Sequence, residues 1–359
     1  MKIHIVGAGL VGTSIGMVMG ARGAEIIFSD SSERSARLAQ DLVGAGNVLT
    51  NDPADLLIAA VPTDQSAAVI IEAFKSNLAH NFMDVASVKT KCVAEIEAFD
   101  PNLAAKYCGT HPMAGREVSG PESAQAELFQ GRPWILTPGP QTSSQTLALI
   151  SQIIQAANAI EIHMTPQEHD EAMALVSHSP QVLASLMAGE LTSHSPNSAQ
   201  LAGQGIRDVT RIAASESNLW VGILKANAQA LKPVLTSLHT RLGSVIAALE
   251  PEVDQVSISK FLETGRLGQA LIPGKHGGKR KYVVLPVLIE DAPGQLKRLF
   301  IDAGDADVNI EDVSMEHSPG QPTGVVQLSV APESAEHLLN YLSERGWRIY
   351  PPRNPANLA

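Results

Sequence analysis

The first third of the chain alternates short apolar runs with segments of helical spacing. Residues 2–6 form a β-branched run, residues 11–22 place apolar side chains at helical spacing, and residues 25–29 are again apolar. Nearly continuous apolar strands between helices are typical of a parallel sheet that is buried on both faces. The alternation continues with a predicted helix at 32–42 and predicted strands at 56–61, at 82–85, up to about Gly109, at 134–137 and at 159–162.

From Thr165 to about Leu271 the pattern is helical almost throughout, which predicts a second, all-α domain. Its first helix has a clear start. Thr165 suits the N-cap, Pro166 suits the first helical position, and Glu168 completes a capping box. Pro180 lacks a backbone donor, so we expect the helix to kink at this point.

Residues 273–281 read PGKHGGKRK, a glycine-rich basic segment that predicts a linker. Beyond it the order is strand, helix, strand, strand, helix, strand, which is typical of a ferredoxin-like fold. We therefore expect an α/β domain at 1–163, a helical domain at 164–272 and a βαββαβ domain at 282–351. In the last of these, the predicted strands are 282–289, 309–317, 323–330 and 347–350, and the predicted helices are 294–303 and 333–345.

Composition and charge narrow the class of protein. A chain of 359 residues with 44% hydrophobic content is long enough for two or three domains with their own cores. The net charge of -11 argues against nucleic acid or an anionic membrane as a partner, because both repel an acidic protein. No apolar run reaches the roughly 20 residues of a membrane span, and glycines interrupt the apolar N-terminus. We therefore expect a cytoplasmic protein.

The sequence predicts neither a disulfide framework nor a metal site. Cys92 and Cys108 are its two cysteines, and they form no repeated Cys-x-x-Cys pattern. His163, His169 and His178 are the closest group of histidines, but their spacing does not match the His-Glu-x-x-His motif of a metal-binding helix.

A glycine-rich turn lies between the first predicted strand and helix. In its G-x-G-x-x-G pattern, Gly7 permits a tight turn, Gly9 lets the backbone approach a pyrophosphate, and Gly12 allows close packing of helix on strand. Asp30 ends the second strand, where an acid accepts hydrogen bonds from a ribose. The sequence thus predicts a Rossmann-type doubly wound sheet that binds a nicotinamide dinucleotide. The predicted cofactor residues are Gly7, Gly9, Leu10, Val11, Gly12, Asp30, Ser31, Val61 and Pro62.

The residues around Asp30 favour NAD over NADP. A carboxylate at this position binds both ribose hydroxyls and would repel a 2′-phosphate. Ser31, Ser32 and Arg34 follow closely and offer groups suited to a phosphate, so NADP remains an alternative.

Four further segments carry a more specific pattern. They are DVASVK at 84–89, GTHPMAG at 109–115, HD at 169–170 leading to SH at 177–178, and GIRDVTRIA at 205–213 with LW at 219–220. Together they resemble the prephenate and arogenate dehydrogenase family of tyrosine biosynthesis. The resemblance implies an oxidative decarboxylation, in which hydride leaves ring C4 of a cyclohexadienol, the 4-hydroxyl loses its proton and the ring carboxylate leaves as carbon dioxide.

The resemblance assigns His111 as the catalytic residue that takes the proton of the 4-hydroxyl. The position suits this role, because His111 follows a strand and precedes a proline at the carboxyl edge of the sheet, where ligands bind. An imidazole titrates near neutrality and can act as a base. The resemblance also implies that Ser87 hydrogen-bonds His111 and approaches the nicotinamide. Alternatively, Ser87 caps a helix that begins near Val88. We expect a structural role for Lys89.

An acidic protein needs local cations to hold the two carboxylates of prephenate. Arg211 occupies the arginine position of the family, and guanidinium binds carboxylate bidentately. Arg207 lies one helical turn earlier and is expected to pair with Glu117 or Asp170, as the family's ionic gate suggests. Trp220 is similar to an aromatic residue that reaches a neighbouring subunit's site in relatives. Together with the helical domain, this implies a homodimer.

One departure from the family concerns the substrate. Many relatives read SHLPH where this chain reads SHSPQ from Ser177 to Gln181, so an amide replaces the last imidazole. In the family this position faces the substrate side chain, which is a keto acid in prephenate and an amino acid in arogenate. Gln181 offers a donor or an acceptor but no titratable charge. We expect prephenate as the substrate, with arogenate as the alternative.

The C-terminal segment resembles an ACT domain, a small module that often binds amino acids. Asp291 and Gly294 lie between a predicted strand and helix, and Asn309 and Ile310 begin the next strand. A glycine at a helix start exposes backbone donors suited to a carboxylate. We expect an aromatic amino acid as effector at these four residues. The alternative is a dimerisation module without a ligand.

Two rival functions remain from the sequence. One is another NAD-linked enzyme with a helical dimerisation domain, of the 3-hydroxyacyl or 6-phosphogluconate type, which would leave the motif around His111 without a role. The other is a non-catalytic nucleotide sensor, whose activity would not depend on His111.

Overall fold

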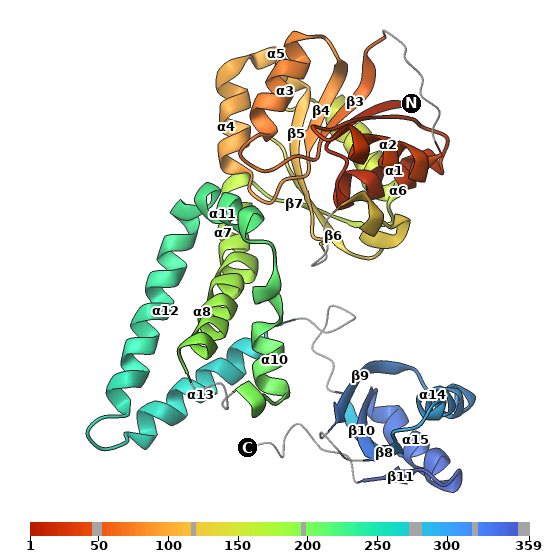
Figure 1. Cartoon of the computed structure of the whole chain (residues 1–359), viewed down its shortest axis with the longest axis vertical. Helices are drawn as coiled ribbons and strands as arrows, with labels where there is room; N and C mark the ends of the chain where they lie inside the picture. The colour runs from red at the N-terminus through yellow and green to blue at the C-terminus, as the bar shows by residue number, and fades with distance from the viewer. Residues whose placement is uncertain (45–51, 116–119, 195–198, 273–281, 318–321, 351–359) are drawn as a thin grey trace. The chain divides into compact units, whose positions relative to one another are not determined.

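The computed structural model describes residues 1–44, 52–115, 120–194, 199–272, 282–317 and 322–350 (Figure 1). Its contacts divide the chain into two compact units, Met1–Arg241 and Leu242–Ala359, and each unit is described by itself. The predicted linker at 273–281 lies outside the described residues.

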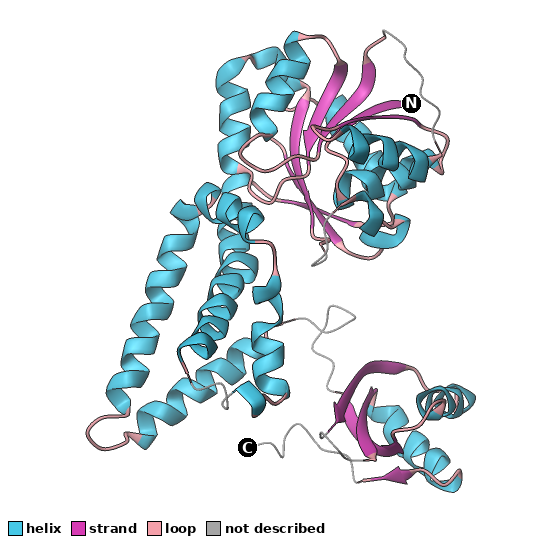
Figure 2. Cartoon of the chain, in the orientation of Figure 1, coloured by secondary structure: helices cyan, strands magenta, loops and turns pink. Residues whose placement is uncertain are grey.

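The first unit begins with a seven-stranded sheet in the order β2-β1-β3-β4-β5-β6-β7. The pairs among β1 to β5 are all parallel, and helices alternate with these strands as predicted (Figure 2). The strands are β1 (Lys2–Val6), β2 (Glu25–Ser29), β3 (Ala54–Ala59), β4 (Ala79–Asp84), β5 (Tyr107–Pro112), β6 (Pro133–Thr137) and β7 (Ile160–His163).

The sheet departs from the predicted parallel arrangement at β6. This strand pairs antiparallel to β5, and β7 is parallel to β6. Between β5 and β6 the described residues form only two short 3₁₀ turns, η1 (Pro121–Ser123) and η2 (Ala126–Phe129). A parallel neighbour is usually reached through a crossover helix that returns the chain to the opposite edge of the sheet, and no such helix occurs here among the described residues. The apolar pattern of β6 fits a buried strand in either direction, so it could not show the reversal.

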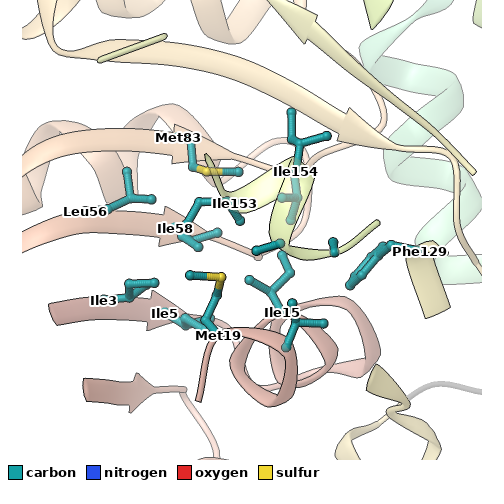
Figure 3. Close-up of a cluster of buried hydrophobic side chains, with 14 of the residues drawn as sticks. Ile3, Ile5, Ile15, Met19, Leu56, Ile58, Met83, Phe129, Ile153 and Ile154 are labelled. Atoms are coloured by element: carbon teal, nitrogen blue, oxygen red, sulfur yellow. The ribbon is translucent and has the colours of Figure 1, made fainter. Parts of the chain in front are cut away.

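Helices cover both faces of this sheet, which confirms the doubly wound arrangement. On one face, α1 (Leu10–Gly20), α2 (Glu33–Val43) and α6 (Ser144–Ala156) pack on the strands. Figure 3 shows this core, in which Ile15 and Ile153 meet strand residues such as Ile58. On the other face, α3 (Ser66–Lys75), α4 (Thr90–Phe99) and α5 (Pro101–Ala105) bury a second core around Phe82.

The turn from β1 to α1 is too tight for side chains at two of its glycines. Gly7 has a φ angle of 106°, and a Cβ there would lie 2.2 Å from the carbonyl oxygen of Ala60. A Cβ at Gly12 would lie 2.1 Å from the carbonyl oxygen of Gly7. β1 has β2 on one side and β3 on the other, so the chain reverses its winding here. This is the topological switch point at which open α/β sheets bind ligands.

The rest of the first unit is helical, as predicted. Thr165 N donates to Glu168 Oε2 at 2.9 Å, and Glu168 N donates to Thr165 Oγ1 at 3.2 Å, which confirms the capping box. Just before Pro180 the α-helix gives way to a π-helical turn, where we expected a kink. The elements are α7 (Pro166–Met173), the π turn η3 (Ala174–His178), α8 (Ser179–Ser193), α10 (Gln204–Thr210), η4 (Arg211–Ala214) and α11 (Ser217–Ala226). α12 (Ala228–Ala248) runs on into the second unit.

The second unit contains α13 (Gln255–Gln269) and a four-stranded antiparallel sheet in the order β11-β8-β10-β9. The βαββαβ order is the predicted one. Its buried core joins alternate strand residues such as Leu285 and Leu328 to Leu299 and Leu338 of the two helices. The elements are β8 (Val283–Glu290), α14 (Gln295–Asp305), β9 (Ile310–His317), β10 (Thr323–Val330), α15 (Pro332–Glu344) and β11 (Arg348–Ile349).

Many large apolar side chains of the helical segment are exposed. Val176, Leu186 and Val221 are 61%, 63% and 65% exposed. Exposed apolar surface on this scale is typical of a surface that another molecule covers. In the described part of the chain, every helix is too short or too polar to cross a membrane.

Replacing Gly12 by alanine should destabilise the first unit. The new Cβ would press on backbone and on Ile5, and such overpacking typically costs about 1–3 kcal/mol. Gly9→Ala is the matched control, because a Cβ at Gly9 meets no atom within 4 Å. Thermal unfolding should show a clearly lower Tm for Gly12→Ala and a much smaller change for Gly9→Ala. Equal Tm values for the two variants would contradict the close packing of α1 on β1.

Candidate active site

The N-terminus of α1 is open to a ligand. Gly9 is the N-cap residue, with φ -86° and ψ -168°, and the space beside it is empty of protein atoms within 4 Å of an added Cβ. Leu10 and Val11 form the first turn, whose N–H groups have no partner within the helix. This cradle fits a pyrophosphate, since the helix N-terminus favours anions. NAD bound here would be held by the turn from Gly7 to Gly12.

Asp30 is tied to this turn. Its Oδ2 accepts a hydrogen bond from Ala8 N at 2.8 Å, and its Oδ1 accepts from Ser32 N at 2.8 Å and from Ser31 Oγ at 3.4 Å. Because each carboxylate oxygen can accept two hydrogen bonds, Oδ2 keeps capacity for a ribose hydroxyl. The Ser32 hydroxyl caps α2 by accepting from Ser35 N.

Two further predicted cofactor residues lie beside the turn. Val61 and Pro62 directly follow β3, and Val61 N lies 3.2 Å from the position of a Cβ at Gly7. They therefore lie at the switch point between β1 and β3.

His111 lies at the carboxyl end of β5 and contacts a second imidazole. His111 Nδ1 is 2.9 Å from His169 Nε2, and the two rings meet edge to face with centroids 5.1 Å apart. His169 Nδ1 in turn lies 2.8 Å from Asp170 Oδ1. Two residues of α7 therefore continue a line of hydrogen bonds that starts at His111.

The Asp170 carboxylate also binds the start of α4. Lys89 N donates to Oδ1 and Thr90 N donates to Oδ2, each at 2.8 Å. The Nδ2 group of Asn227 donates to the Asp170 carbonyl at 2.8 Å and lies 2.9 Å from His178 Nδ1. The helical segment is thus joined to the sheet domain directly beside His111.

A buried ion pair supports the strand that carries His111. Lys89 and Asp84 pair with both side chains fully buried. Lys89 Nζ also donates to the carbonyl of Thr110 at 2.7 Å, and the hydroxyl of Tyr107 donates to Asp84. Lys89 therefore anchors the backbone next to His111, in line with its expected structural role.

The imidazoles of this site are neutral near pH 7. Burial, with His169 and Lys89 nearby, holds the pKa of His111 well below 6.5. Burial also lowers the pKa of His169, and it lowers that of His178 to about 4. For Asp170, burial would raise the pKa, but hydrogen bonds from His169 and from the start of α4 hold it below 3.8. The site therefore combines neutral imidazoles with an ionised carboxylate.

Comparison with known proteins identifies the family. Residues 16–162 match the model of the prephenate dehydrogenase nucleotide-binding domain, and residues 165–264 match that of the prephenate dehydrogenase dimerization domain. The probable prephenate dehydrogenase NovF of Streptomyces niveus is 31% identical over 355 residues, which cover 96% of this chain and 98% of the relative. The chain belongs to the prephenate dehydrogenase family. The predicted family, and with it an NAD-dependent oxidoreductase, is confirmed.

Two further members extend this comparison. The cyclohexadienyl dehydrogenase of Zymomonas mobilis is 33% identical over 285 residues, which cover 75% of this chain and 95% of the relative. The crystal structure of prephenate dehydrogenase from A. aeolicus, in complex with hydroxyphenyl propionate and NAD⁺, has a TM-score of 0.67 at 24% identity. That match covers 75% of this chain and 97% of the crystallised chain, and it supports the fold.

Neither expected contact of Ser87 is present among the described residues. Ser87 makes no hydrogen bond to His111 there, and His111 Nδ1 faces His169 instead. Nor does Ser87 cap a helix. α4 begins at Thr90 and Asp170 caps it. The carboxylate that stabilises the helix start comes from 80 residues further along the chain, which local sequence could not show.

The expected pairing of Arg207 with Asp170 is also absent. Asp170 is already bound by His169, Lys89 and Thr90, and no ion pair with Arg207 occurs in the part of the chain that the structure describes. Glu117, the other expected partner, lies outside the described residues.

The predicted substrate residues lie on neighbouring helical elements. Arg207 and Arg211 are exposed on α10 and η4, both of which pack against α8. Gln181 is buried on α8, its Nε2 donates to Ser185 Oγ at 3.5 Å, and its Oε1 has no hydrogen-bond partner among the described residues. Ser177 is half-buried in the π turn. The ring of Trp220 lies 6.1 Å from that of His178.

Sequence reasoning missed the roles of His169 and Asn227. In the sequence, His169 belongs to the HD segment at 169–170 and to a histidine group whose spacing fits no metal motif. In the described residues, no three His, Cys, Asp or Glu side chains are grouped to hold a metal ion. The adjacent pair His169-Asp170, one residue after a capping box, was the available signal. Asn227 is buried between α11 and α12, and the sequence offers no comparable signal for its role.

The buried neutral imidazoles predict how stability depends on pH. In the unfolded chain these histidines titrate near 6.5, but His111, His169 and His178 have lower pKa values when folded. As pH falls below about 6.5, the unfolded chain therefore binds protons that the folded chain does not, and the free energy of unfolding decreases. Above about pH 7 these groups contribute no pH dependence.

Calorimetry should therefore show a Tm that is level above neutrality and falls as the pH drops from about 6.5 towards the folded-state pKa of His178, which is about 4. Asp170, with its lowered pKa, affects stability only at lower pH. A Tm that rises with acidity in this window would mean that the imidazoles are charged in the folded protein.

Proposed function

We propose that the protein converts prephenate to 4-hydroxyphenylpyruvate and carbon dioxide. The observation that carries the proposal is His111, a neutral imidazole at the carboxyl edge of the sheet, on the same edge as the glycine turn. NAD, held at that turn, supplies the hydride acceptor. In the balanced reaction the substrate loses hydride from C4 and its ring carboxylate as carbon dioxide, and the ring becomes a phenol.

His111 handles the proton in this reaction. It accepts the proton of the 4-hydroxyl as the C4–O bond becomes a carbonyl. Loss of the carboxylate then leaves a phenolate oxygen, to which His111 returns the proton. Burial suits the step, because a neutral imidazole is ready to accept a proton at any pH above its lowered pKa. Ser87 is proposed to lie next to the nicotinamide of bound NAD.

The exposed arginines provide the charge that the substrate requires. Arg211 is proposed to bind a carboxylate of prephenate, since guanidinium stays ionised and can form two parallel hydrogen bonds. Arg207, with Glu117 as its remaining expected partner, is proposed to gate the same cleft. Ser177 and Trp220 complete the proposed substrate residues.

The amide of Gln181 favours prephenate over arogenate. Arogenate carries an ammonium group where prephenate carries a keto group, and burying an ammonium calls for an anionic partner. Gln181 is buried and carries no negative charge that could pair with an ammonium. Arogenate remains the alternative, because one relative is named a cyclohexadienyl dehydrogenase.

We propose a cytoplasmic homodimer for the whole chain. The match to a dimerization domain and the exposed apolar side chains of the helical segment, among them Leu186 and Val221, support a second copy as the covering molecule. The domain bounds 1–163, 164–272 and 282–351 are proposed with it.

The C-terminal βαββαβ segment is proposed to be an ACT-like regulatory domain. Gly294 is the N-cap of α14 with a φ angle of 90°, in the exposed loop that contains Asp291. Asn309 is exposed, with its Nδ2 donating to Glu311 Oε1 at 3.0 Å, and Ile310 begins β9. These residues are proposed to bind an aromatic amino acid, with tyrosine or phenylalanine as the effector.

Turnover tests the proposed reaction. Absorbance of the reduced cofactor should rise with prephenate and NAD, and more slowly with arogenate or with NADP. His111→Asn should lower kcat by about 100- to 10,000-fold, the usual contribution of a general base, while NAD affinity stays unchanged by calorimetry. His80→Asn, which alters an exposed histidine of β4, is the matched control. If neither prephenate nor arogenate reduces NAD or NADP, or if the His111→Asn variant keeps the wild-type rate, the proposal is contradicted.

Thermal shift tests the proposed effector. Tyrosine or phenylalanine should raise the Tm of the intact protein, since a ligand that binds the folded state stabilises it. Deleting residues 282–359 should abolish the shift while turnover remains. If the intact protein shows no shift with any aromatic amino acid, the C-terminal domain is not such a regulator.

A further inference from the structure

We propose that His169 and Asp170 are positioning residues that hold the Nδ1 proton of His111, so that Nε2 of His111 is the base. The proposal rests on the proposed role of His111 and deepens it. It assigns a function to a line of hydrogen bonds that begins on β5 and ends at the first turn of α4.

The first step is the state of Asp170. Its carboxylate accepts hydrogen bonds from two backbone N–H groups, those of Lys89 and Thr90, which are donors at any pH. A carboxylate held by such donors stays ionised and is an acceptor only. His169 Nδ1, at 2.8 Å from Oδ1, must therefore carry a proton and donate it.

The proton on His169 Nδ1 fixes the protonation of His111 in turn. A neutral His169 with a proton on Nδ1 presents a lone pair at Nε2. His111 Nδ1, 2.9 Å away, must therefore donate to that lone pair. In the neutral ring of His111 the other nitrogen, Nε2, is then unprotonated, so the base points away from His169.

The third step concerns the charges around the pair. Lys89, the residue before α4, is the nearby cation, but its ammonium is paired with Asp84 of β4, whose carboxylate also accepts from Tyr107 of β5. From η3, His178 is neutral, and Asn227 holds its Nδ1. Among the described residues, Asp170 is therefore the carboxylate that is hydrogen-bonded to the imidazole pair.

This arrangement has a consequence in turnover. When His111 accepts a proton at Nε2, its Nδ1–H becomes a charge-assisted donor to His169, and the ionised Asp170 stabilises the cation through one intervening ring. Asp170 cannot rotate away, because two N–H groups of α4 hold both of its oxygens. No proton has to leave His169, so the pair fixes orientation and charge without taking part in bond making.

Substitutions of His169 test whether it positions His111. His169→Phe removes the acceptor for His111 Nδ1, and we expect the rate of cofactor reduction in single turnovers to fall about 10- to 100-fold, as for other supporting groups of this kind. Substrate KM should change little, and the acid limb of the rate should move to lower pH, because the His111 cation loses its support. His169→Gln keeps an acceptor oxygen and should recover most of the rate.

The control is His163→Gln. His163 pairs with the carboxylate of Glu161 at 2.6 Å but is exposed on β7, so it tests the loss of a histidine–carboxylate pair that does not reach His111. This variant should react like the wild type, and the Tm of every variant confirms folding.

The possible outcomes distinguish the positioning role of His169 and Asp170 from the proposed function. If the wild type is active and the His169→Phe variant is equally fast, the positioning role of His169 is contradicted and the proposed function still stands. The positioning role is also contradicted if folded His169→Phe shows only a raised KM, or if His169→Gln reacts no faster than His169→Phe. A wild type that reduces no cofactor with either substrate overturns both.

Discussion

The Asp170 carboxylate is the constraint on which the site depends. Its two oxygens accept hydrogen bonds from the backbone at the start of α4 and from His169, so one side chain of α7 joins the helical segment to the sheet domain. Without it, the first turn of α4 would lose its cap and His169 would lose its orientation. Because His169 contacts His111, the geometry of the base depends on the same carboxylate. Stability and chemistry are therefore coupled at this point.

Much of the fold follows from local physical rules. The glycine turn predicts both the β1–α1 packing and the open helix N-terminus, because a Cβ at Gly12 would collide with backbone whereas one at Gly9 would not. The capping box predicts the start of α7 to the residue. The direction of β6 could not be predicted, since a buried apolar strand has the same pattern whichever way it runs. Direction depends on the connection, which here lacks a crossover helix among the described residues.

The site was predictable where one residue carries the chemistry and not where residues act together. His111 could be found from its position after a strand and from the family motif. Its partner could not, because His169 is 58 residues away and no spacing rule joins a strand end to the face of a later helix. The expected contact between Ser87 and His111 came from the family resemblance, whereas the structure places His169 at His111 Nδ1. The burial that keeps these imidazoles neutral is likewise a tertiary property.

The protonation state of His111 tests this account most directly. Nitrogen NMR of the protein labelled with ¹⁵N-histidine distinguishes a protonated from an unprotonated ring nitrogen, and His111→Asn assigns the signals. At neutral pH, His111 should be neutral, with its proton on Nδ1 and with Nε2 free. A ring with its proton on Nε2, or an imidazolium at neutral pH, would contradict the line of hydrogen bonds from Asp170 to the base.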